Sequence, residues 1–269
     1  MASVASAAPR SRAPGWAVVL GQELRDLWIG GRGLLLSLAF SLLLSVMAYL
    51  VATNRALNFL EQREAVNLTL QVAIAVGALL TLLAAADAFS GERERGTLES
   101  LLLTPVSRLD LTVGKLLAAL SLWLAAFLIT VPYVWFLGRG VGLVGDALAT
   151  GLVVGTLLAL FLASLGMIVS VFASSNRLSL SLSLFALLAL FAPTQLPASA
   201  QRGWAGDLLL RVNPLTAGEH YVGKVVVDAH SWSQDTSWLV SPIVAAAVFT
   251  VAALLVGSRW VRLRGGTAG

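Results

Sequence analysis

The chain has 269 residues, of which 58% are hydrophobic and only 12% are charged. Soluble globular proteins carry about 25% charged residues, and the mean hydropathy of +0.85 also argues against that class. The chain has no cysteine, which excludes disulfides and thiolate chemistry. A helix needs about 20 apolar residues to cross a bilayer. Several runs of this kind predict a multi-pass membrane protein, and the net charge of +4 then fits loop charges that set orientation, with no nucleic acid as partner.

The N-terminal region is expected to have two parts. Residues 1–14 are rich in Ala, Ser, Pro and Arg, lack the apolar core of a signal peptide, and are predicted to be a disordered cytoplasmic tail. Over residues 15–32, Leu20, Leu24 and Leu27 recur at helical spacing while the charged residues lie on other faces. This pattern predicts an amphipathic helix in the membrane interface. A helix that faces the cytoplasm before the first span fits the same residues.

Six apolar runs predict six transmembrane helices within a transmembrane domain at residues 33–264. They are expected near residues 33–52, 67–88, 111–137, 147–173, 178–197 and 239–257. The run LSLSLSLF at the start of the fifth alternates like a strand, but a lone strand in lipid would leave its backbone hydrogen bonds unmade. We therefore expect an all-α membrane protein.

Basic residues predict the orientation of these spans. With six spans and a cytoplasmic N-terminus, 12 of the 18 Lys and Arg residues lie on the cytoplasmic side, while the acidic residues divide evenly. This bias favours both termini in the cytoplasm. Residues 198–238 then form the longest extracytoplasmic loop, expected to be interfacial with short helices. Its two histidines, His220 and His230, are ten positions apart without a cysteine nearby, so no metal site is expected.

Two of the predicted spans carry ridges of small residues four positions apart. Helices in lipid associate by close backbone approach at such residues. The ridges therefore predict packing seams, either within one chain or between chains, although abundant Ala and Gly could also produce them by chance. Their members are Ala73, Gly77, Thr81 and Ala85 in the second span, and Gly151, Gly155 and Ala159 in the fourth.

A charged stretch, FSGERERGTLE at residues 89–99, lies between the second and third spans. Thr97 can cap a short helix, and Pro105 stops it, so a helix is expected at about residues 91–105. Ser107 and Asp110 then form a capping-box pattern at the start of the third span. The short helix has two interpretations: a hairpin whose charges fix topology, or a docking element for a cytoplasmic partner. Its apolar face would contain Leu98, Leu101 and Leu102.

The run AADAFSGERERGTLESLLLTPVSRLDLTVGK closely resembles the signature region of ABC-2 type transporter permeases. The matching features are Asp87 near the end of the second span, the stretch Glu92–Glu99, the Leu-Leu-Thr-Pro at 102–105, and Gly114 with Lys115 at the start of the third span. The likeness is specific in this run. Elsewhere it rests on length, six spans, the amphipathic N-terminal helix and an Asn-Pro-Leu at 213–215.

The resemblance implies a fold, partners and a role. The fold would be the ABC-2 (type V exporter-like) permease fold, in the bacterial cytoplasmic membrane. Two permeases, identical or homologous, would pair with two cytoplasmic ATPase subunits, commonly as an exporter. The helix at 91–105 would be a coupling helix seated in a groove of the ATPase. The implied coupling residues are Glu92, Arg93, Glu94, Arg95 and Glu99 at its rim and Thr97, Leu98, Leu101 and Leu102 in its seat, with Gly96 between them.

The permease itself is expected to have no catalytic, cofactor or metal site. Gly114 and Lys115 lack the preceding glycine and following Ser or Thr of a phosphate-binding loop, so a partner would hydrolyse ATP. Three alternatives stay open. A secondary carrier would place ionisable groups at mid-membrane depth, an intramembrane enzyme would need clustered acid–base groups inside the spans, and a permease-like subunit that transmits ATPase motion without transport would need an outer partner.

Overall fold

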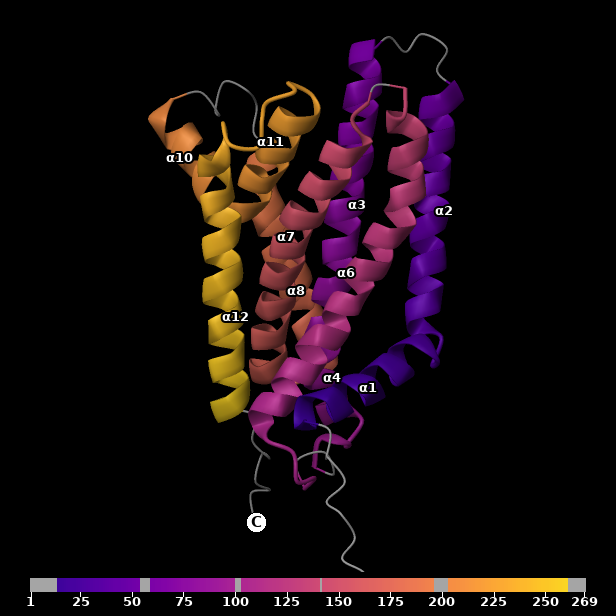
Figure 1. Ribbon diagram of the computed structural model, residues 1–269. Coiled ribbons are helices and arrows are strands. Elements are labelled where there is room, and N and C mark those ends of the chain that lie inside the picture. Colours follow the sequence, from indigo (N-terminus) through magenta and orange to yellow (C-terminus); the bar gives the residue numbers. More distant parts are fainter. Residues whose placement is uncertain (1–13, 54–58, 100–102, 141, 196–202, 261–269) are drawn as a thin grey trace, which may run out of the picture.

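The computed structural model describes residues 14–53, 59–99, 103–140, 142–195 and 203–260, and all regular elements in these ranges are helices (Figure 1). The α-helices are α1 (Gly15–Trp28), α2 (Arg32–Thr53), α3 (Phe59–Asp87), α4 (Ser90–Glu94), α6 (Arg108–Gly138), α7 (Val144–Phe172), α8 (Asn176–Phe191), α10 (Trp204–Val212), α11 (Pro214–Val226) and α12 (Val240–Trp260). Two 3-10 helices, η1 (Ala192–Gln195) and η2 (Thr236–Leu239), also lie within the described ranges. The tail at 1–13 lies outside the described residues.

Five helical segments among the described residues are long and apolar enough to cross a membrane. They are Arg32–Leu50, Gln62–Glu94, Arg108–Gly138, Val144–Phe172 and Thr236–Trp260. The predicted fifth span, near residues 178–197, is shorter than expected: α8 has 16 residues, and the chain continues as η1 around Pro193. Proline has no N–H for the α-helical ladder. Figure 1 shows that α1 and α4 lie at one end of the bundle, which we call the α1 end, and that α10 and α11 lie at the opposite end. Helix α8 runs from the α1 end toward the opposite end.

The segment predicted as an extracytoplasmic loop, residues 198–238, is only partly interfacial. Helix α11 enters the hydrophobic core, where Ala217 and Val222 are fully buried. Asn213 begins this helix, because its side-chain oxygen accepts from Leu215 N–H (2.9 Å) and its amide donates to the Leu190 carbonyl (2.5 Å). The segment contains short helices, as expected, but α11 is more buried than an interfacial loop would be, because it packs against α7, α12 and α3.

The small-residue ridges lie at helix–helix contacts within this one chain. Trp123 of α6 lies between them: a Cβ at Gly77 of α3 would come 2.8 Å from its ring, and a Cβ at Gly155 of α7 would overlap the other side of that ring. The Trp123 indole also donates to the Thr156 hydroxyl (3.1 Å). The remaining ridge residues are buried too, namely Ala73, Thr81, Ala85, Gly151 and Ala159.

At Gly166 the backbones of α3 and α7 approach each other closely. A Cβ at this position would lie 2.6 Å from the carbonyl oxygen of Leu82, a backbone atom that a rotamer change does not move. Gly166→Ala is therefore expected to lower the free energy of unfolding by about 1–3 kcal/mol, as overpacking does in cores. The measurement is denaturant unfolding of the purified protein in detergent.

Gly145→Ala is the matched control for Gly166→Ala. It lies in the same helix, α7, and a Cβ there would meet nothing within 4 Å. Alanine is a better helix former than glycine, so stability should stay equal or rise. Equal losses in both variants would contradict the close approach of α3 and α7.

Candidate functional site

Helix α1 lies across one end of the bundle of long helices and packs against the first turns of α6 (Figure 1). Gly114 of α6 makes this approach possible, because a Cβ there would lie 2.7 Å from a methyl carbon of Val19 and 3.1 Å from the backbone nitrogen of Leu20. The Trp28 indole donates to the Ser121 hydroxyl (3.1 Å). The amphipathic helix is thus fastened to the protein along its length, and it ends at Trp28, before Gly31 turns the chain with φ +83°.

Lys115 is the centre of this end. Its side chain is 1% exposed, and its Nζ lies 2.5 Å from Oε1 of Glu23 on α1 and 3.5 Å from Oε1 of Glu92 on α4. A buried ammonium requires paired charge, since desolvation alone costs several kcal/mol. One lysine of α6 therefore holds together two elements that lie far apart in the sequence.

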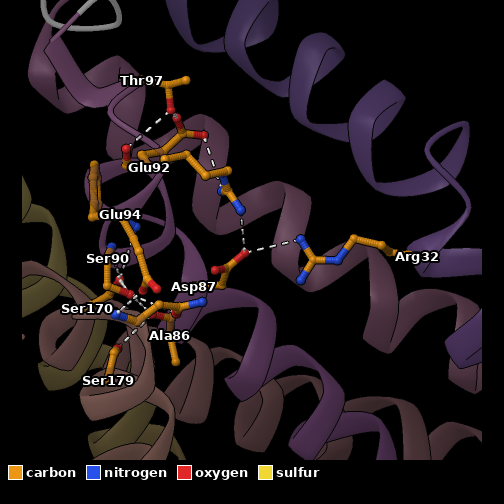
Figure 2. A network of polar contacts seen from close by, with 12 residues as sticks. Arg32, Ala86, Asp87, Ser90, Glu92, Glu94, Thr97, Ser170 and Ser179 are labelled. Carbon is orange, nitrogen blue, oxygen red and sulfur yellow. Dashed lines mark hydrogen bonds and ion pairs between the residues drawn. The ribbon is translucent and has the colours of Figure 1, made fainter.

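A chain of charges continues from Glu92 to α2 (Figure 2). Glu92 lies 3.8 Å from Arg95, which lies 3.7 Å from Asp87 at the end of α3. Asp87 also pairs with Arg32 at the start of α2, at 3.3 Å. The Thr97 hydroxyl closes the turn after α4 by donating to the Glu92 carboxylate. Together with the Lys115–Glu92 pair, these contacts connect α2, α3, α4 and α6 through side chains alone.

The break between α3 and α4 is fixed by serines from other helices. The backbone N–H groups of Phe89 and Ser90 both donate to the Ser170 hydroxyl of α7, at 3.0 and 2.9 Å. The Ser90 and Ser179 hydroxyls both donate to the Ala86 carbonyl, each at 2.7 Å (Figure 2). The backbone groups released where α3 stops are thereby satisfied, as buried polar groups must be.

Arg93 and Glu94 bind the connection between α7 and α8. The Arg93 guanidinium donates to the carbonyls of Val171 (3.0 Å) and Ala173, and Glu94 accepts from the backbone N–H of Asn176 (2.9 Å). The charged stretch therefore has a definite structural partner. It joins the α3–α4 turn to the start of α8.

The structure corrects the prediction of one helix at 91–105. Helix α4 ends at Glu94, and Gly96, with φ +71°, turns the chain before helical backbone resumes at Leu98. Glycine adopts this left-handed conformation at little cost. The predicted cap at Ser107 is confirmed: its hydroxyl accepts from the Asp110 N–H (3.0 Å) and α6 starts at the next residue.

The spacing had predicted that Leu98 lies on an exposed apolar face, and this prediction was wrong. Leu98 is 4% exposed and packs with Phe89, Leu116 and Met167 inside the bundle. Leu101 and Leu102 lie outside the described residues. Glu99 and Leu103 are exposed, Leu103 at 82%. The exposed surface of the segment between α4 and α6 therefore includes Glu99 and Leu103, which we call its tip.

Several residues of the site were not expected from the sequence. Glu23 and Arg32 look like ordinary interfacial charges, and Ser170 and Ser179 like scattered polar residues in spans. A buried lysine needs a counter-charge, and a broken helix needs partners for its free backbone groups. The sequence does not show that Lys115 is buried or that the helix breaks at residue 88, so it could not predict these partners. The described residues contain no group of three or more His, Cys, Asp or Glu that could hold a metal ion.

Comparison with known proteins agrees with this architecture. The family model described as ABC-2 family transporter protein matches residues 17–259, from α1 to the end of α12. A search of curated proteins finds no match. The helices and the family define a multi-pass transport protein of the membrane. The chain belongs to the ABC-2 family and is a permease subunit of an ABC transporter, a transmembrane component that associates with ABC ATPase subunits and is generally not itself catalytic.

Removing the buried ammonium tests the junction. Lys115→Met removes the cation that pairs with Glu23 and leaves Glu92 with Arg95 alone, so the free energy of unfolding should fall by about 3–5 kcal/mol. Denaturant unfolding in detergent measures this loss. Limited proteolysis should also cut the chain before α2 faster, because α1 loses its anchor.

Lys224→Met provides the control with the same substitution. Lys224 forms an ion pair with Asp228 at 2.9 Å, but both side chains are substantially exposed, at 32% and 44%. Exposed pairs contribute little, so stability should hardly change. Similar losses in the two variants would show that Lys115 is not a structural centre.

Proposed function

We propose that this permease exports its substrate and is driven through the α1 end by cytoplasmic ATPase subunits. In this proposal six segments cross the bacterial cytoplasmic membrane, with α8 and η1 together as the fifth and both termini inside. The observation that supports it most strongly is the Lys115 junction, which ties α1, α4 and α6 into one body. Two permeases, identical or homologous, would assemble with two ATPases.

The contacts provide a route for force. A push on the segment after α4 reaches α7 and α8 through Arg93 and Glu94. It reaches α1 and α6 through Glu92 and Lys115, and α2 through Asp87. Such charge-assisted contacts are directional, so a displacement of α4 moves several helices together. The described site thus has the connectivity that coupling requires.

The proposed docking surface is the tip between α4 and α6. Glu99 and Leu103 are exposed there, while Leu98 anchors the tip to the bundle. Leu101 and Leu102 are proposed contacts as well. A few fully desolvated side chains near the centre of a contact carry most of its binding energy. Glu92, Arg93, Glu94 and Arg95 then act mainly inside the permease, by positioning the tip.

Transport is favoured over a role as a passive transmitter to an outer partner. The segment between α8 and α12 would be the natural place for an outer domain. Its main helix, α11, is instead buried between α7, α12 and α3. Within the described ranges this segment is part of the bundle, where it is suited to line or close a path.

Replacing the exposed leucine of the tip tests docking. Leu103→Glu puts a charge into the proposed contact, so co-purification with the cognate ATPase subunit should fall about tenfold or more. Folding should be unaffected, because Leu103 is 82% exposed. Leu208→Glu on α10 is the control, since Leu208 is 54% exposed at the opposite end. Equal co-purification of both variants would place the ATPase contact elsewhere.

Single cysteines test the orientation, since the chain has none. Thr104 and Ser233 are both exposed and lie at opposite ends of the bundle. In intact cells a membrane-impermeant maleimide should label Ser233→Cys and should label Thr104→Cys only after permeabilisation. The reverse pattern would overturn the proposed topology.

A further inference from the structure

A separate cavity of about 430 Å³ lies at the end opposite to α1, between α3, α10, α11 and η2. One face of α11 forms its floor, because Thr216, Glu219, Gly223 and Val227 follow each other at helical spacing. Gly223 faces open space, since a Cβ there would meet nothing within 4 Å. The Lys115 junction does not reach this cavity, which has its own chemistry.

Glu219 is the unpaired charge in this cavity. Its carboxyl makes no hydrogen bond or ion pair with any other described residue, and burial raises its pKa. The nearby cations are already engaged: Lys224 pairs with Asp228 at 2.9 Å, and the Arg211 guanidinium lies 4.5 Å from the ring centre of Trp238. A half-buried carboxylate without a counter-charge is costly.

His220 does not supply the missing positive charge. Its ring lies against the Trp238 ring, with centres 4.1 Å apart. Burial, together with the charge of Lys224, lowers the pKa of His220 and so disfavours its charged form. The described lining therefore combines the unpaired carboxylate of Glu219, the Lys224–Asp228 ion pair, the polar side chain of Gln71 and the apolar side chains of Leu210 and Trp238.

We propose that this cavity binds an organic cation, an amine on an apolar body, with Glu219 as its counter-ion. A metal ion fits poorly, because calcium and magnesium take six or more oxygen ligands, whereas the described lining supplies two carboxylates, and that of Asp228 is already paired with Lys224. An ammonium group needs one carboxylate and acceptors such as the Thr216 hydroxyl, while its carbon body is accommodated by Leu210 and Trp238. Binding here involves only the permease, so it goes beyond the proposed coupling to an ATPase.

The experiment uses the full chain in lipid nanodiscs and dicyclohexylcarbodiimide, which modifies protonated carboxyls in apolar surroundings. Peptide mass spectrometry should find Glu219 labelled. Benzylamine should slow this labelling about tenfold or more, the effect of one charge-assisted contact. Benzyl alcohol has nearly the same shape without the charge and should protect little.

Two variants complete the test. Glu219→Gln should lose the label. Gly223→Leu fills the floor of the cavity from a position with open space, so Glu219 should still be labelled but benzylamine should no longer protect it. Absence of label on Glu219 in the wild type, equal protection by both compounds, or full protection in Gly223→Leu would each overturn the proposal. None of these results would bear on ATPase co-purification, so the two proposals can fail separately.

Discussion

One buried ammonium group governs the arrangement of the α1 end. Lys115 is almost completely withdrawn from solvent, and only the carboxylates of Glu23 and Glu92 make that position tolerable. Each carboxylate comes from a different element, so displacing either α1 or α4 removes one of the two partners of this buried ammonium. The ion pairs add little net stability compared with apolar packing, but they specify which elements meet.

The sequence predicted the parts of this structure that depend on local patterns. Apolar runs located the long spans, and the Ser107 cap was read from spacing alone. The prediction failed where a side chain's direction depends on tertiary contacts. Leu98 lies inside because the turn at Gly96 rotates it toward Phe89, and α11 is buried because α7 offers it an apolar surface. Neither fact has a periodic signature.

In the candidate site, too, the sequence predicted the features that depend on local patterns and missed those that depend on tertiary contacts. Its location followed from the family likeness around residues 87–115, and the comparison with the ABC-2 family supports that likeness over residues 17–259. The roles of Arg93 and Glu94 did not follow, because exposed charges and charges bound to a distant turn look alike in a sequence. Their partners are backbone groups of the α7–α8 connection, which any residue type can provide.

The indole of Trp123 has a consequence for motion. Lying between Gly77 and Gly155, it fills the space where α3, α6 and α7 meet, and a closely packed interior does not deform gradually. We therefore expect these three helices to move together. Any opening of a path across the membrane then occurs at the margins of that group, along α2, α8 or α12, whose outward faces carry exposed apolar side chains such as Leu38, Phe185 and Val248. A substrate would then enter where α2, α8 or α12 shifts relative to the packed group of α3, α6 and α7.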